Sequence, residues 1–155
     1  MPDQLTQESF TVFVKNAEPK LSYALAAAYG PQVGKEATAD AMAYGWEHWD
    51  DVKDMKNPAG YLYRVGQTAA RKYQRKQALF PAVESRELPQ VEPGLPSALE
   101  GLTELQRIAV VLLYAMEWSE REIADLLGVD RSTVRRHRDR GLAKLRSSLE
   151  VDAGA

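Results

Sequence analysis

The last third of the sequence concentrates positive charge. Seven of the sixteen residues from Arg131 to Arg146 are Lys or Arg, although the 155-residue chain has a formal net charge of −2. A guanidinium can bind a phosphate or donate to both acceptors on a guanine edge. A solvated helix face usually mixes acids with bases, whereas Asp139 is the only acid in this run. The charge pattern of this segment therefore indicates that it contacts nucleic acid.

Helical geometry divides this segment into two faces. At about 100° per residue, Val134, Gly141, Leu142 and Leu145 form an inward stripe. The basic residues lie mostly outside this stripe, and small residues near the start of the helix would let its N-terminus approach a DNA backbone. We predict a groove-reading face made of Arg131, Ser132, Thr133, Arg135, Arg136, Asp139 and Arg140.

The residues just before this segment predict a helix-turn-helix. Ile123 and Leu127 are spaced to face inward, and Ala124 permits two helices to approach closely. Gly128 can make the turn, and Asp130 can cap the second helix. This geometry, combined with the basic outer face, predicts binding to duplex DNA.

A second basic cluster lies near the middle of the chain. Five Lys or Arg and no acid occur from Arg64 to Gln77. Asn57 can cap a helix there, with Pro58 at its first position, where the missing N–H costs nothing. One face of this helix could follow a phosphate backbone. The residues on that face are Arg64, Thr68, Arg71 and Arg75.

Apolar spacing predicts helices throughout and no strand. From Phe10 to Ala28, apolar residues recur at three- and four-residue steps, and Pro19 should kink or divide that helix. Two further helices are expected at about residues 35–49 and 58–76. Two more helix starts are predicted later in the chain, where a Ser or Thr is followed three residues later by Glu or Gln. The two pairs are Thr103 with Gln106 and Ser119 with Glu122.

The segment between the two basic regions has a different composition. Four prolines occur within residues 77–97, and no apolar period continues through them. We therefore predict an all-α fold of two small helical domains, residues 5–77 and 99–150, of which the second contains the helix-turn-helix. Residues 78–98 form the expected Pro-rich linker between them.

Several classes of function are not expected. The chain has no Cys, and its two histidines, His48 and His137, fall in different predicted domains, so neither a metal site nor a catalytic triad is indicated. Acid pairs such as Asp50 and Asp51 lie in a polar turn that would not desolvate them. No stretch resembles a membrane span or a signal peptide. We expect a cytoplasmic protein that is not an enzyme and needs no metal or other cofactor.

The sequence resembles the extracytoplasmic-function sigma factors, small promoter-specificity subunits of bacterial RNA polymerase. The resemblance to their region four runs from Leu102 to Arg146, through "SEREIADLLG" and "TVRRHRDRGLAKLR". Residues 10–76 resemble region two through "AAAYG", "WEHWDDV" and "NPAGYLYRVGQTAARKYQRK". The resemblance thus covers both predicted domains, and the Pro-rich segment falls where the family has its interdomain linker.

The resemblance implies a role for each group of residues. The groove-reading face would recognise the upstream promoter element. The loop 50–57 and the helix after it would bind the downstream element and help to melt it, through Asn57, Tyr61, Arg64, Thr68, Arg71 and Arg75. Glu36 and Asp40 match polymerase-binding positions. The implied partners are core RNA polymerase and promoter DNA, and an anti-sigma factor is a further candidate.

The sequence departs from the family pattern at four positions. Ala39 replaces a Gln on the second helix, and Thr68 and Lys72 stand where Asn and Asp are common. Arg138 replaces a Leu of the recognition helix and brings a charge to the edge of the inward stripe. These changes bear on polymerase docking and on promoter melting.

Two other interpretations remain open at this level. A free-standing helix-turn-helix regulator would bind duplex DNA as a dimer without polymerase, but it would leave the basic cluster at 64–76 without a role. A sigma-like paralogue that has lost promoter melting would act only through protein interactions, which the departures at Ala39, Thr68 and Lys72 would allow.

Overall fold

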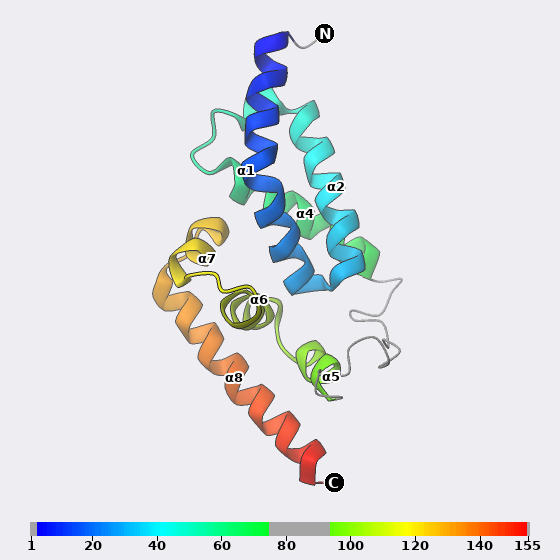
Figure 1. Cartoon of the computed structure of the whole chain (residues 1–155), viewed down its shortest axis with the longest axis vertical. Helices are drawn as coiled ribbons and strands as arrows, with labels where there is room; N and C mark the ends of the chain where they lie inside the picture. The colour runs from blue at the N-terminus through cyan, green and yellow to red at the C-terminus, as the bar shows by residue number, and fades with distance from the viewer. Residues whose placement is uncertain (1–2, 75–93, 155) are drawn as a thin grey trace.

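The computed structural model describes residues 3–74 and 94–154, and over these residues the chain forms helices and no strand. The all-α prediction is therefore confirmed. Figure 1 shows the order of the elements and places the two ends of the chain at opposite ends of an elongated molecule. The elements are α1 (Gln4–Tyr29), α2 (Pro31–Glu47), α3 (Trp49–Val52), α4 (Pro58–Gln74), α5 (Leu95–Glu100), α6 (Glu104–Val110), the π-helical turn η1 (Val111–Ala115), α7 (Glu120–Leu127) and α8 (Arg131–Gly154).

The first half of the molecule is a bundle of α1, α2 and α4. Its apolar faces pack together around Leu21, Leu25, Val33 and Leu62, all with at most 1% of their surface exposed. Pro19 lies inside α1 without dividing it. The second helix begins four residues earlier than expected because Pro31 occupies its first turn, where its missing N–H has no intrahelical partner to lose.

The three helix starts predicted from Asn57, Thr103 and Ser119 are confirmed. The Asn57 side-chain oxygen accepts the Gly60 N–H at 3.1 Å. Thr103 and Gln106 form a reciprocal capping box at the start of α6, and Ser119 and Glu122 form another at the start of α7. Each box satisfies N–H groups that would otherwise lack partners in the first turn.

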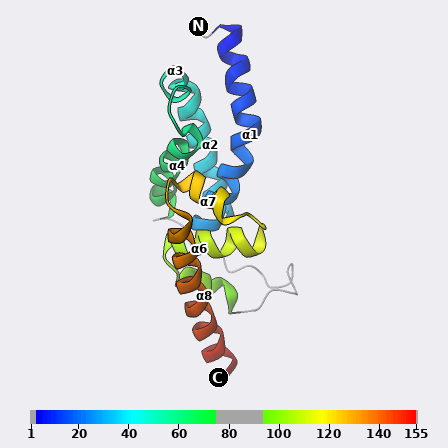
Figure 2. The ribbon, with the colours of Figure 1, turned by 90° about the vertical axis from the view of Figure 1, so that its left-hand side faces the viewer.

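The second half is built on the long helix α8, against which α5, α6 and α7 pack. Figures 1 and 2 show α8 running away from the first bundle to the C-terminus. The predicted inward stripe is confirmed, since Val134, Gly141 and Leu145 are buried and Leu142 is partly buried. The face on the other side of α8 is thereby left toward solvent.

The two halves share one hydrophobic core. The cluster that contains Leu25 and Leu62 continues through Ile108, Leu112 and Ile123 of the second half. A smaller cluster lies between α5, α6 and α8. Residues 95–98, placed in the linker by the sequence, begin α5 instead. The division of the chain into domains 5–77 and 99–150 stays a prediction, and residues 75–93 lie outside the described part.

Candidate nucleic-acid interface

The turn between α7 and α8 has the expected geometry. Gly128 ends α7 in the left-handed conformation, with φ 69° and ψ 36°, which an L side chain rarely adopts. Its N–H and that of Val129 both donate to the Ala124 carbonyl. Ile123 is fully buried and Ala124 is 4% exposed, as predicted, whereas Leu127 is only partly buried and Leu126 packs inward instead. These residues form the helix-turn-helix and present α8 as its second helix.

The outer face of α8 is open to solvent. Of its seven predicted residues, six are exposed and Thr133 is partly buried. Arg131, Arg136 and Arg140 make no ion pair with any residue of the described ranges. Their guanidinium groups are therefore available to phosphates or base edges. The exposed members are Arg131, Ser132, Arg135, Arg136, Asp139 and Arg140.

One acid of α7, for which the sequence predicts no role, orders part of this face. Glu120 accepts from Arg135 Nε at 2.7 Å and from Arg138 Nη1 at 3.2 Å. Arg138 Nε also donates to Asp139 at 2.9 Å. The charge that Arg138 brings to the edge of the inward stripe is thus neutralised locally, while Arg135 is held toward α7. The sequence feature that could have predicted this pairing is an acid at the start of α7, one helix before the arginines of α8.

His137 adds no charge to this face near neutral pH. Burial, together with the positive charges of Arg136 and Arg140, lowers the pKa of His137 below its ordinary value. Its Nδ1 atom is buried and has no hydrogen-bond partner among the described residues. The side chain therefore serves as neutral packing beneath the arginines.

The basic face of α4 is also exposed, but part of it is engaged. Arg64, Thr68, Arg71 and Lys72 are exposed, whereas Leu62 on the other side is fully buried. Arg71 donates to Glu104 of α6, with Nη2–Oε2 at 2.9 Å and Nε–Oε1 at 3.4 Å. Arg75 falls outside the described residues.

The start of α4 lies against the end of α7. A cleft of about 220 Å³ lies between the two helices. The Asn57 side-chain amide donates to the Asp125 carbonyl at 2.8 Å. Residues of both predicted DNA-binding units therefore line one cleft. They are Asn57, Gly60, Tyr61 and Arg64 from the first half and Leu126, Leu127 and Gly128 from the second.

An aromatic cluster supports the chain where the sequence predicts a loop at residues 50–57, although residues 50–52 belong to α3 instead. Trp49 is 5% exposed, and its ring lies 5.2 Å from that of Phe10 and 4.9 Å from that of Phe13. Trp46 packs on Phe10 as well, but 37% of its surface is exposed. Trp49 is therefore part of the core, whereas Trp46 lies at its edge.

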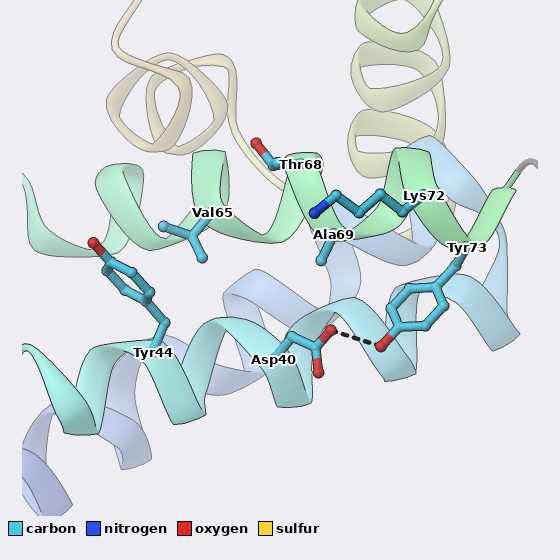
Figure 3. A pocket seen from close by; sticks show the side chains of 7 residues that line it. All are labelled: Asp40, Tyr44, Val65, Thr68, Ala69, Lys72 and Tyr73. Carbon is cyan, nitrogen blue, oxygen red and sulfur yellow. Dashed lines mark hydrogen bonds between the residues drawn. The ribbon is translucent and has the colours of Figure 1, made fainter.

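A groove of about 540 Å³ runs between α2 and α4. Figure 3 shows Asp40 of α2 facing Tyr73 of α4 across it, and Tyr44 lying nearer Val65. The Tyr73 hydroxyl donates to Asp40 at 2.6 Å. Glu36 lies one turn earlier on α2 and accepts from Gln32. The two predicted polymerase-binding acids thus share one helix, and Asp40 is held by α4.

A helical fold with a helix-turn-helix and basic helix faces is typical of DNA-binding proteins, and the chain was compared with known proteins. Residues 94–145 match the family model of sigma-70, region 4. The chain is similar in structure to the sigma factor RpoE of Bartonella quintana, solved with the anti-sigma factor NepR. That match has 18% identity and a TM-score of 0.57, and it covers 92% of this chain and 98% of the other.

A second solved structure shares the fold. CnrH, solved in complex with the cytosolic domain of CnrY, matches with 23% identity and a TM-score of 0.62, covering 94% of this chain and 90% of the other. No curated protein matches the sequence. Residues 94–145 therefore match sigma-70 region 4, and the chain as a whole shares the fold of RpoE and CnrH. None of the described helices is long and apolar enough to cross a membrane.

Proposed function

We propose that the chain is a promoter-specificity subunit that binds core RNA polymerase, recognises promoter DNA and helps to melt it. The observation that carries this proposal is the exposed face of α8, on which Arg131, Arg136 and Arg140 make no ion pair with the described residues, within the region that matches sigma-70 region 4. A second basic face on α4 gives the chain a separate surface for the strand that melting exposes. The two basic faces thus support a protein that contacts DNA through two surfaces.

Upstream recognition is assigned to α8. Arg136 and Arg140 project from the middle of the exposed face, where side chains of a recognition helix reach base edges. Ser132 and Thr133 are small enough for the start of the helix to approach the backbone. The full set is Arg131, Ser132, Thr133, Arg135, Arg136, Asp139 and Arg140.

Downstream recognition and melting are assigned to α4 and to the loop before it. Arginines bind the phosphates of a separated strand, and aromatic rings or guanidinium planes stack on its bases. Tyr61 supplies such a ring, and its hydroxyl lies 3.2 Å from that of Tyr44. The full set is Asn57, Tyr61, Arg64, Thr68, Arg71 and Arg75.

Contact with core polymerase is assigned to Glu36, Asp40 and the groove beside them. Asp40 is exposed and Glu36 is half-buried, so both acids are accessible on one face of α2. An anti-sigma factor is a further proposed partner, because RpoE, which shares the fold, was solved with one. With these partners the chain would act in the cytoplasm, without catalytic activity of its own. The two assigned DNA surfaces would belong to domains 5–77 and 99–150.

Reconstitution with core polymerase tests the proposal. The purified chain should bind core RNA polymerase and direct transcription from specific start sites on genomic DNA, which sequencing of the transcripts identifies. A free-standing regulator would shift duplex DNA without retaining polymerase, and a purely protein-binding paralogue would retain polymerase without specific starts. Either of those results would contradict the proposed function.

A further inference from the structure

The helix-turn-helix lies on the part of α4 that is assigned to the downstream element. Asn57, the capping residue of α4, donates to the Asp125 carbonyl of α7. Gly60 brings the two backbones together, because a Cβ atom added there would lie 2.8 Å from the Leu126 carbonyl oxygen. While α7 is in place, only the cleft of about 220 Å³ separates the two helices at this point.

A second contact occupies an arginine of the same surface. Glu104, in the first turn of α6, accepts from Arg71 at 2.9 Å and from the Tyr29 hydroxyl at 2.8 Å. Tyr29 belongs to α1 and is fully buried. The carboxylate neutralises the guanidinium and would repel a phosphate brought close to it. Glu104 therefore holds the two halves together and competes with DNA for Arg71.

A third contact ties α6 to the end of α1. Arg107 is only 5% exposed, and its Nε donates to the Ala28 carbonyl at 2.8 Å. Ala28 lies in the last turn of α1, where carbonyls lack intrahelical partners and the helix dipole favours a cation. The Nη1 atom of Arg107 donates to the Leu102 carbonyl at 2.8 Å. One buried guanidinium thus bridges the two halves.

We propose that these contacts close the chain into an autoinhibited form, in which α7 lies against the start of the downstream DNA surface and Glu104 pairs with Arg71, while Arg64 and Thr68 stay exposed. The inference rests on the proposed function, since it concerns the regulation of the same surface. The outer face of α8 stays exposed in the closed form, so upstream duplex binding remains possible. Holding a separated strand requires α6 and α7 to leave α4. The closing contacts are Asn57–Asp125, Tyr29–Glu104, Arg71–Glu104 and Arg107–Ala28.

The first test measures the distance between the halves in the free, full-length chain. The chain has no Cys, so Glu18→Cys on α1 and Ser147→Cys on α8, both exposed, accept spin labels specifically. Pulsed electron–electron double resonance should give one narrow distance distribution. Tyr29→Phe, which removes the hydroxyl without changing charge, and Glu104→Gln should each add a second, longer-distance population. Circular dichroism checks that the helices are intact.

The second test measures DNA affinity in the same variants. The probe is a fluorescent forked duplex whose unpaired strand has been selected from a random pool. A closed chain binds more weakly in proportion to the fraction that is open, so each variant should bind the fork about threefold to tenfold more tightly than the unmodified chain. The variants and the unmodified chain should bind duplex that carries only the upstream element with equal affinity. Glu150→Gln, an exposed acid of α8, is the matched charge control and should leave fork affinity unchanged.

The outcomes separate this proposal from the proposed function. Identical distance distributions in the unmodified chain, Tyr29→Phe and Glu104→Gln would overturn the closed form, even if the chain directs transcription normally. A longer-distance population in the variants supports the closed form without reference to polymerase. Equal fork affinity despite that population would overturn the autoinhibition.

Discussion

The two basic helices of this chain carry similar charge but differ in what surrounds them. On α8, Arg131, Arg136 and Arg140 project into solvent without ion pairs among the described residues. On α4, Arg71 is paired with Glu104, and the helix start is covered by the end of α7. The number of arginines on a helix therefore does not report how accessible they are to DNA.

The difference corresponds to two steps that we propose for promoter recognition. Duplex DNA presents its grooves before any conformational change, so an exposed α8 can find the upstream element at once. A separated strand exists only after melting, when α4 is required. Keeping Arg71 paired and the start of α4 against α7 until that stage would limit non-specific binding to single strands, which basic and aromatic surfaces bind with little sequence preference. The predictions below test whether the two faces differ in this way.

The largest effect is expected from removing the α4 arginines. Replacing Arg64, Arg71 and Arg75 together with Ala should abolish open-complex formation with core polymerase, because the separated strand loses its cationic partners. The measurement is permanganate reactivity of unpaired thymines. Upstream duplex binding should persist, since α8 is unchanged. Normal permanganate reactivity would remove the melting role from this face.

A large effect on stability is expected at Arg107. Arg107→Met keeps an apolar stem but leaves the Ala28 and Leu102 carbonyls buried without this donor. The free energy of unfolding should fall by about 2 kcal/mol or more, as measured by urea denaturation. Arg121→Met is the control, because Arg121 is exposed on α7, and it should change stability by less than about 0.5 kcal/mol. Equal stability of both variants would contradict the bridging role of Arg107.

Substitutions of different arginines on the α8 face should weaken duplex binding by different amounts. Arg136→Ala should weaken binding to a selected upstream duplex by about 1 to 3 kcal/mol if Arg136 reads a base. Arg135→Ala should cost less, because Arg135 is already paired with Glu120 in the free chain. Mobility shifts on selected and scrambled duplexes separate base reading from phosphate binding. Equal losses for the two variants would show that the pairing with Glu120 does not persist.

The smallest effect concerns pH. Burial by itself raises the pKa of Glu104, but the hydrogen bonds from Arg71 and Tyr29 outweigh it, so the pKa is lowered overall. A carboxyl with a lowered pKa stabilises the fold above its unfolded value, near pH 4.3, and this contribution is lost as the pH falls through the folded value. The Tm difference between the unmodified chain and Glu104→Gln should therefore be largest near neutral pH and shrink in acid. A difference that grows in acid would contradict the assigned pairing.

Local features of this fold could be predicted from the sequence. The cap at Asn57 and the boxes at Thr103 and Ser119 depend on residues three positions apart, and all three formed as expected. The inward stripe of α8 follows from helical periodicity, which is also local. The boundaries were less accurate, because Pro31 allowed α2 to start directly after α1, and α5 begins within residues assigned to the linker.

The sequence by itself determined the helices, their caps and the two basic faces, because each depends on neighbours within one or two turns. Only the tertiary structure decided that α7 covers the start of α4, that Glu104 holds Arg71 and that Glu120 holds Arg135. The first of these contacts joins residues 68 positions apart and the second joins residues 33 apart. No periodic pattern encodes such a pairing, since it arises from how the apolar faces of separate helices pack into one core.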